Sequence, residues 1–416
     1  MSASLNPSKL APHHAPRYAL APILGIQCME VMTGIGLTLL GSSLPALAAL
    51  WHLDDASSGR LLLAVFAGSA AGALLVRAPF HRNLAAGMAM IAISMAGLAL
   101  GGGHALFFFF LLFGTGLGLA MTANSVLTGD RYRERRAAML TILNFSWSAG
   151  AAVSPFAVQC VIHRAGVQGL FWCMTAAGVF SALLALSLGS ERTASTQELS
   201  QRTSAVTMQS SKRIVTFFGI FGLLYCGAEA ALGGWVLTYV HRLDFHMSAA
   251  PPLAASCFWL SLLVGRAVAP AVLLRVREEM LLAVALICSF VGVAALLTLH
   301  ALPSVMLSAA VAGFSMAPIF PICVSIFMSL ARNPAQTRWM FAIAGLGSAT
   351  LPWATGQLAA RTGSLHTGLL VPLFALGLML VMMRWPGGGT DLFRSIFRPA
   401  DERPLPPAGP TVSPTL

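Results

Sequence analysis

The chain has 416 residues, of which 57% are hydrophobic and only 9% are charged. A soluble globular protein carries about 25% charged residues, so this composition excludes a water-facing surface over most of the chain. The formal net charge of +11 raises nucleic-acid binding as an interpretation, but the placement of the basic residues, described below, argues against it.

The hydrophobic residues gather in long runs that are rich in Gly and Ala, a composition that suits close helix contacts in lipid. A helix needs about 20 apolar residues to cross a hydrocarbon core about 30 Å thick. Twelve runs meet this length, near residues 19–46, 60–76, 84–101, 105–128, 138–161, 168–188, 214–240, 252–274, 280–299, 303–330, 339–360 and 367–384. The sequence therefore predicts an all-α membrane protein with twelve transmembrane helices.

Polar segments divide the runs into two six-helix bundles. The expected organisation is a cytoplasmic tail at 1–18, a bundle at 19–188, a Ser/Thr/Gln-rich cytoplasmic linker at 189–213, a bundle at 214–384 and a Gly- and Pro-rich tail at 385–416. The last segment has the composition of a disordered chain. No connection is long enough to hold a soluble enzymatic domain.

The basic residues follow the positive-inside bias of a multi-span protein. With the N-terminus cytoplasmic, Arg266 lies within the eighth run and four arginines lie outside: Arg60, Arg164, Arg242 and Arg361. The other Lys and Arg fall on the cytoplasmic side. We expect a plasma membrane location, a bacterial inner membrane in particular, with both termini cytoplasmic and no nucleic-acid partner.

The two halves also repeat one another. The segment from Gly150 to Pro155 recurs from Gly347 to Pro352, 197 residues later. Near the start of each half, Glu30 to Gly34 is echoed by Glu229 to Gly233 at an offset of 199. Both halves enter the membrane in the same sense, which predicts parallel repeats with a binding site between them near the midplane.

Each half holds one carboxylate deep in an apolar run, Glu30 in the first and Glu229 in the second. Counted from the basic residues that precede them, both lie about 20–24 Å along their helices, near mid-depth. A charge there is costly, so we consider both as proton-coupling or substrate-binding groups. The alternative is a carboxyl bonded to a neighbouring helix. Arg266 is a charge partner, a substrate contact or a structural residue at the cytoplasmic gate.

Amides and aromatic rings inside the runs are candidates for binding a neutral polyol, and the alternative for each is helix packing. The substrate-binding candidates are Gln27, Asn124, Asn144, Trp147, Tyr225, Trp235, Trp353 and Gln357.

Four motifs in order resemble the major facilitator superfamily, and within it the fucose permease-type sugar:proton symporters. They are Tyr225 to Glu229 with Gly233-Gly234-Trp235, then Phe258-Trp259 with Gly265-Arg266, then Ala317 to Pro321, then Gly347 with Pro352-Trp353 and Gly356. The resemblance covers residues 19–384 and implies twelve helices around a central cavity.

Two departures from that family are visible. The loop after the second run has Arg77 where the family has Asp, and Arg82 follows, so both are candidates for a rebuilt gate between the halves. The fucose permease carries an acid in its fourth span, whereas the fourth run here reads Met121 to Asn124 and holds no acid. The resemblance therefore does not fix the identity of the sugar or the number of protons per solute.

The function expected is secondary active transport of a small polar, sugar-like solute, driven by protons and using no cofactor or metal. Efflux of amphipathic compounds and a non-transporting solute sensor are the alternatives. An enzyme is not expected, because the chain lacks the spacing of metal ligands and any phosphate-binding loop outside an apolar run. We expect a monomer that contacts solute, protons and lipid.

Overall fold

A computed structural model describes residues 20–384, apart from 78, 102–104, 133–135, 189–207, 244, 246, 248 and 331–333. The described residues form thirteen helices. The first half holds α1 (Leu20–Trp51), α2 (Asp55–Leu74), α3 (Phe80–Ala99), α4 (Leu106–Arg131) and α5 (Arg136–Ser187). The second half holds α6 (Met208–Arg242), α7 (Ala250–Leu273), α8 (Glu278–Thr298), α9 (Leu302–Met316), α10 (Ile319–Leu330), α11 (Pro334–Thr362), α12 (Leu365–Gly368) and α13 (Leu370–Arg384).

These helices make the twelve predicted crossings of a membrane. Ten described stretches are long and apolar enough to span one. The stretch Met139–Ser187, at 49 residues, is two crossings joined at Gly166, whose φ of 69° interrupts helical geometry in α5. Counting it twice and adding α11 gives twelve. The predicted run 303–330 is one crossing in two pieces, because Pro318 separates α9 from α10.

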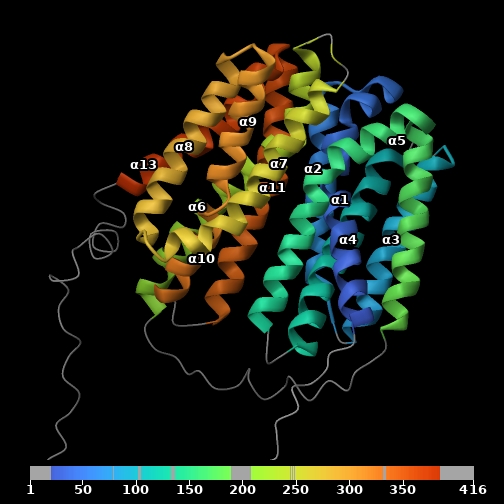
Figure 1. The fold of residues 1–416 in the computed structure, drawn as a ribbon, viewed down its shortest axis with the longest axis horizontal. Coiled ribbons are helices and arrows are strands. Elements are labelled where there is room, and N and C mark those ends of the chain that lie inside the picture. Colours follow the sequence, from blue (N-terminus) through green and yellow to red (C-terminus); the bar gives the residue numbers. More distant parts are fainter. Residues whose placement is uncertain are drawn as a thin grey trace, which may run out of the picture.

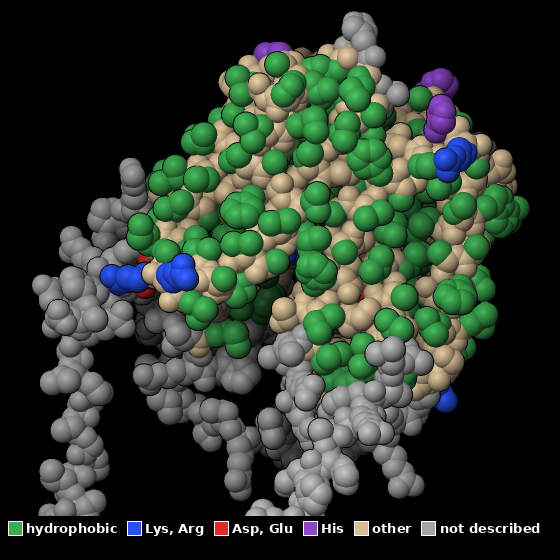
Figure 2. All heavy atoms as spheres, in the orientation of Figure 1, with side chains coloured by type: hydrophobic (Ala, Val, Ile, Leu, Met, Phe, Trp, Pro, Cys, Tyr) green, Lys and Arg blue, Asp and Glu red, His purple; other side chains and the backbone are tan. Residues whose placement is uncertain are grey.

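The two halves lie side by side as separate bundles (Figure 1). Hydrophobic side chains cover most of the visible face, and the few Lys and Arg lie mainly near its margins (Figure 2). Leu74, Leu274 and Phe374 are 81%, 87% and 73% exposed, which is the arrangement of a protein whose outer surface contacts lipid.

The predicted segment boundaries differ from the helices in one place. Helix α6 begins at Met208, inside the predicted linker 189–213, so the polar end of that linker extends the helix. The predicted tails 1–18 and 385–416, and most of the linker, lie outside the described residues.

The repeat predicted at an offset of 197 corresponds to matched structure. Gly166 and Gly363 have φ values of 69° and 67°, and each ends the fifth helix of its half. Gly150 in α5 lies against the carbonyl of Val31, and Gly347 in α11 lies against the carbonyl of Leu223. In both halves, therefore, the fifth helix packs closely on the first at the same glycine.

The offset of 199 between the first helices is wrong, and packing corrects it to 192. Val31 and Leu223, which meet the matched glycines, are 192 residues apart. Gly41 and Gly233, which meet one another between the halves, are also 192 apart. The residue equivalent to Glu229 is therefore Leu37, not Glu30. The difference of seven residues is about two helical turns, or about 10 Å along the axis.

Candidate functional site

A cavity of about 130 Å³ lies between the two halves, enough room for several water molecules. The first half contributes α1, α2 and α5 to its wall, and the second contributes α6, α7 and α11. Its lining residues are Leu37, Thr38, Gly41, Leu62, Phe66, Trp147, Cys226, Glu229, Ala230, Gly233, Gly234, Trp259 and Ser348. Leu37 and Glu229, which occupy equivalent positions in the repeat, both line it.

Glu229 and Arg266 form an ion pair beside this cavity. The Arg266 Nη2 atom lies 3.0 Å from Glu229 Oε1, with the side chains 28% and 13% exposed. Arg266 also donates to Ser148 Oγ at 3.1 Å and lies 5.5 Å from the centre of the Trp147 ring. Because Glu229 and Arg266 belong to one half and Ser148 and Trp147 to the other, the guanidinium links the halves at mid-depth.

Two tryptophans from opposite halves meet in the cavity wall. The rings of Trp147 in α5 and Trp259 in α7 are edge-to-face, with centroids 6.0 Å apart. Gly233 makes this possible, because a Cβ there would collide with the Trp259 ring. The indole N–H of Trp147 is buried and has no hydrogen-bond partner among the described residues. A buried donor without an acceptor is costly, so a water molecule or a solute that reached this N–H would stabilise it.

Glu30 lies elsewhere. Its side chain is 3% exposed, and Asn124 Nδ2 donates to Glu30 Oε2 at 2.7 Å and to the Ile26 carbonyl at 3.2 Å. Glu30 is absent from the lining of the central cavity, because Asn124 of α4 covers it and it lies two turns away from the position equivalent to Glu229. The two carboxylates therefore occupy different environments.

Two candidate amides lie on the interface of α1 and α5. Gln27 accepts a hydrogen bond from Ser146 at 2.8 Å, and its amide nitrogen is buried without a partner. Asn144 is exposed on α5, and its carbonyl accepts from Ser148 at 3.0 Å. Neither lines the central cavity.

Four further candidates also lie outside the lining. Tyr225 donates to the Met316 carbonyl at 2.9 Å beside the α9–α10 break, and Trp235 donates to the Pro352 carbonyl at 3.0 Å. Gln357 donates to the Ala56 carbonyl across the halves at 3.4 Å, and Trp353 is 38% exposed. Tyr225 and Trp235 are thus committed to packing within the second half.

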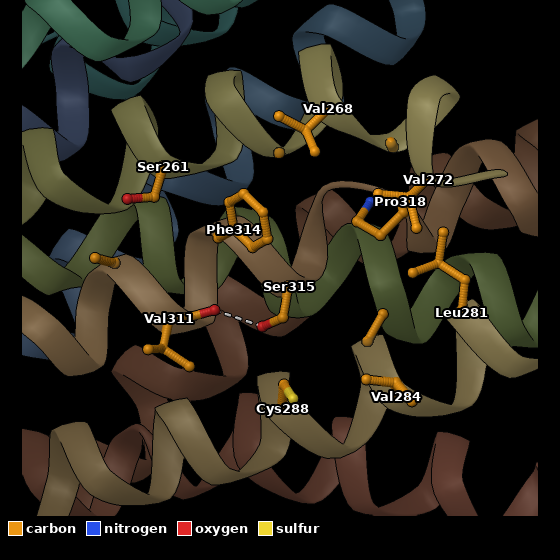
Figure 3. Close-up of a pocket in the computed structure, with 14 residues that line it drawn as sticks. Ser261, Val268, Val272, Leu281, Val284, Cys288, Val311, Phe314, Ser315 and Pro318 are labelled. Atoms are coloured by element: carbon orange, nitrogen blue, oxygen red, sulfur yellow. Dashed lines mark hydrogen bonds between the residues drawn. The ribbon is translucent and has the colours of Figure 1, made fainter. Parts of the chain in front are cut away.

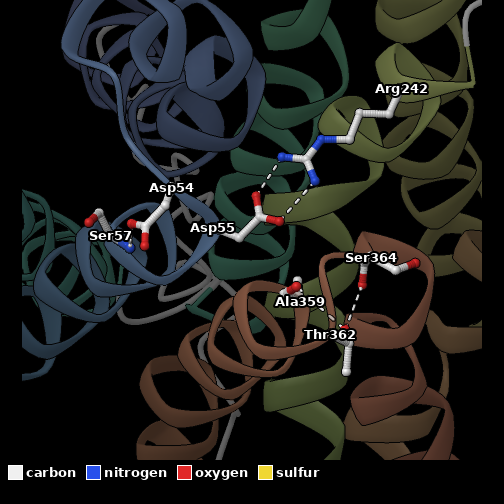
Figure 4. Close-up of polar contacts among 7 residues, drawn as sticks. All are labelled: Asp54, Asp55, Ser57, Arg242, Ala359, Thr362 and Ser364. Atoms are coloured by element: carbon white, nitrogen blue, oxygen red, sulfur yellow. Dashed lines mark hydrogen bonds and ion pairs between the residues drawn. The ribbon is translucent and has the colours of Figure 1, made fainter.

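One end of the bundle, which we call the Asp55 end, is closed by contacts between the halves. Arg242 at the end of α6 binds both carboxylate oxygens of Asp55 at the start of α2, with Nη1 2.9 Å from Oδ2 (Figure 4). Beside this pair, Gly59 of α2 and Gly356 of α11 bring the two helices into close backbone contact. Asp54 caps α2 by accepting from the Ser57 amide at 2.8 Å, and hydrogen bonding from Ser57 lowers the pKa of its carboxyl.

The opposite end, which we call the Arg77 end, carries both predicted gate arginines. Arg77 and Arg82 are exposed in and after the turn between α2 and α3. Asn83 closes this turn by donating to the carbonyls of Arg77 and Pro79. No ion pair joins Arg77 or Arg82 to the described part of the second half.

The sequence interpretation did not select Ser148, Trp259, Asp55 or Arg242 as site residues. Trp259 stands in a motif shared with the resembled family, next to the Gly265-Arg266 pair, and that proximity was the available signal. Ser148 and the Asp55–Arg242 pair depend on contacts between residues more than 110 positions apart, which no local pattern reveals.

The fold and this inter-half cavity define a membrane transporter of the two-bundle type. Residues 28–338 match the family model described as Major Facilitator Superfamily, and the chain belongs to that family. It is accordingly a transporter rather than an enzyme. The comparison with curated proteins gave no match.

Solved transporters share the fold at low sequence identity. The nucleoside transporter NupG is 18% identical, with a TM-score of 0.68 over 91% of this chain and 98% of its own. A bacterial homologue of the lysosomal transporter Spinster, in an inward-facing and occupied conformation, is 12% identical with a TM-score of 0.65 over 86% and 95%. The transporter FucP, in an outward conformation, is 13% identical with a TM-score of 0.59 over 88% and 98%.

Proposed function

We propose that this protein is a proton-coupled secondary transporter of a small polar solute, with Glu229 as the proton-binding group. The observation that carries the proposal is the ion pair of Glu229 and Arg266 at a cavity between the halves. Arg266 reaches across the cavity wall to Ser148 and Trp147, so the charge state of Glu229 and the contact between the halves depend on one another.

The proton and the movement of the halves are coupled through the pairing of Arg266 with Glu229. Protonation of Glu229 removes the carboxylate to which Arg266 is paired. The guanidinium then gains freedom to bind Ser148 more fully or to bind the solute. Rocking of the halves separates Arg266 from Ser148 and Trp147, and loss of the proton restores the pair with Glu229. Each step thus links one proton to one rearrangement.

The proposed orientation rests on the positive-inside bias of the sequence, and the proposed conformational state rests on the closed end. The contacts of Asp55 with Arg242 and of Gly59 with Gly356 close the Asp55 end. We assign that end to the outside of a plasma membrane and the Arg77 end, with both termini, to the cytoplasm. The structure then corresponds to a state that exchanges solute with the cytoplasm.

The solute class follows from the wall of the cavity. The wall holds two indole rings and the carboxylate of Glu229, with the Arg266 guanidinium paired to that carboxylate, and this set suits a solute with a ring face and hydroxyl groups. A sugar or a nucleoside has both features, and a nucleoside transporter is among the proteins with this fold. In this state the cavity of about 130 Å³ suits a solute the size of one ring, so a nucleoside or a long amphipathic compound requires a wider state of the same cavity.

The test is uptake of labelled sugars and nucleosides into proteoliposomes, with and without an inward proton gradient. We expect the gradient to drive accumulation by the wild-type protein. Glu229→Gln should abolish this accumulation but retain exchange of solute across the membrane at equal pH, because exchange needs no net proton movement.

Glu30→Gln is the matched control, since Glu30 is the second carboxylate predicted inside a span and its bond from Asn124 can be kept by the amide oxygen of Gln. We expect Glu30→Gln to retain gradient-driven accumulation. Accumulation that survives Glu229→Gln would contradict the assignment of the proton to Glu229. Export of amphipathic dyes with no uptake of any polar solute would favour the efflux alternative.

A further inference from the structure

A second cavity opens on the lateral surface of the second half, away from the inter-half site. It has a volume of about 430 Å³, within the range of small-molecule sites. Helices α7 and α8 form its sides, and α9 with the α9–α10 break forms its floor. Figure 3 shows Val268 and Val272 of α7 facing Leu281 and Val284 of α8, with Phe314 and Pro318 between them. We call this cavity the α7–α8 groove.

The groove suits a hydrocarbon chain. Its lining is almost entirely aliphatic and aromatic, and the hydroxyl of Ser315 is satisfied by Ser289 and by the Val311 carbonyl. Val268, Val284 and Phe314 are 38%, 47% and 46% exposed, so the groove is open to the side. The other hydroxyl of the lining is that of Ser261, at the midplane end, so a polar ligand would find few partners along the groove, whereas an apolar chain replaces lipid contacts with protein contacts.

The length of the groove matches one leaflet. Along α7 it runs from Ser261 to Val272, a rise of about 16 Å. Half of a hydrocarbon core about 30 Å thick is about 15 Å. The groove therefore begins near the midplane and ends near the headgroups at the Arg77 end of the bundle.

A turn that carries Arg275 lies at the headgroup end of the groove. Arg275 is exposed between α7 and α8, and it makes no ion pair in the described part of the chain. Among the nearby charges, Arg277 pairs with Glu279 at 3.5 Å, and Glu278 accepts a hydrogen bond from Ser325 at 3.0 Å, which holds its carboxylate toward α10. Leu274 is 87% exposed beside Arg275, which places the guanidinium at the boundary of hydrocarbon and headgroup.

We propose that the α7–α8 groove binds one anionic phospholipid, with an acyl chain along Val268 and Val272 and the phosphate at Arg275. The groove provides the chain with a surface one leaflet deep, and Arg275 provides the charge complement. Gly265, which lines the groove, directly precedes Arg266, and it lies within contact of the Phe314 carbonyl. A bound chain thus holds α7 against α9 next to the residue that pairs with Glu229.

The test is lipid binding to the purified full-length protein in detergent. Native mass spectrometry and thermal unfolding are measured with phosphatidylglycerol and with phosphatidylcholine of the same acyl chains. We expect tighter binding and a larger rise in Tm with phosphatidylglycerol. Arg275→Gln should weaken phosphatidylglycerol binding about fivefold, the effect of one basic residue near an anionic surface, and leave phosphatidylcholine unchanged.

Two matched controls accompany the variants. Arg361→Gln removes an exposed arginine at the other end of the same half, and it should retain the preference for phosphatidylglycerol. Val268→Phe fills the groove and should weaken the binding of both lipids. Val291→Phe, on a part of α8 outside the groove, should weaken the binding of neither.

Equal binding of the two lipids by the wild-type protein would overturn the proposal. So would an undiminished preference in Arg275→Gln, a surface change that does not depend on how Val268→Phe folds. A further control is inorganic phosphate alone. If it raised Tm as much as phosphatidylglycerol does, that result would assign the site to a soluble anion and overturn the proposal of lipid binding.

Discussion

At the residue scale, two tryptophans differ in whether their indole N–H makes a hydrogen bond. This difference distinguishes a candidate for solute binding from a packing residue. The indole N–H of Trp147 is buried at the central cavity without a partner, and that of Trp235 donates to the Pro352 carbonyl. Both residues were predicted as binding candidates, since both are aromatic and inside a span. Their partners, which only the fold brings near, distinguish them.

Trp147→Phe should weaken solute binding and leave stability nearly unchanged. The phenyl ring keeps the aromatic face toward Arg266 and Trp259 but lacks the N–H. One hydrogen bond is worth about 1 kcal/mol, so we expect about fivefold weaker binding. The measurement is solute affinity by calorimetry, with Tm recorded on the same preparations.

Trp235→Phe is the opposite case and serves as its control. It removes the hydrogen bond to the Pro352 carbonyl, worth about 1 kcal/mol, and part of a fully buried ring, whose loss adds the cost of a cavity. We expect a lower Tm with unchanged solute affinity. If Trp147→Phe lowered Tm and Trp235→Phe lowered the affinity for the solute, the roles of solute binding and packing would have to be exchanged between the two residues.

The carboxylates show what sequence reasoning could reach at this scale. The apolar surroundings of Glu30 and Glu229 correctly predicted that both are inside the bundle. Their partners, Asn124 and Arg266, come from helices 94 and 37 residues away, and nothing local specifies those pairings. Position in a span was therefore predictable, and chemical environment was not.

At the scale of the helices, glycines set how closely the first and fifth helices of each half approach. Gly150 lies so near the Val31 carbonyl that a Cβ would overlap it, and Gly34 is in the same situation against the Trp147 carbonyl. The reciprocal glycines make α1 and α5 one rigid unit that carries Trp147 and Ser148. Small residues give membrane helices this close contact.

Gly150→Ala should destabilise the protein, because backbone atoms on both helices must move apart. Overpacking of this kind costs about 1–3 kcal/mol. Gly345→Ala is the control, since Gly345 is in α11 with nothing within 4 Å of an added Cβ. Alanine is favoured over glycine in a helix by up to about 1 kcal/mol, so its Tm should hold or rise. Equal losses in both variants would remove the packing explanation.

The helices themselves could be predicted almost completely, but the register between the halves could not. Length and apolar content identify ten stretches, one of them a double crossing, and α11 is the crossing that they leave out, while the Gly166–Gly363 match held at the predicted offset. The equivalence of Glu30 with Glu229 was wrong by seven residues. Seven residues are nearly two full turns, so a slip of that size keeps the same helix face and leaves the apolar pattern unchanged.

At the scale of the whole molecule, the Asp55–Arg242 pair holds the two halves together at one end. We expect Asp55→Asn to increase the population that is open at the Asp55 end. The pair is partly exposed, so its loss should shift the equilibrium by no more than about 1 kcal/mol, or about fivefold. The exchange of charges in Asp55→Arg with Arg242→Asp should restore the wild-type distribution.

The measurement is the distance between spin labels at positions 60 and 361, which lie on α2 and α11 of opposite halves, in a background without the native cysteines. We expect the fraction of molecules with a longer distance to rise in Asp55→Asn. The same fraction should fall again in the variant with exchanged charges. Distances unaffected by either change would show that the close contact of Gly59 with Gly356 closes this end without the ion pair.

The Asp55–Arg242 pair lies at one end of the bundle, so the salt concentration of the surrounding solution affects its strength. Arg242 is 45% exposed at its side chain, so dissolved ions reach it. The Debye length falls from about 8 Å at physiological ionic strength to about 3 Å at 1 M salt. In concentrated salt the closed end is therefore held less firmly. The ionic strength on the side of the membrane that the Asp55 end faces thus affects how often that end opens.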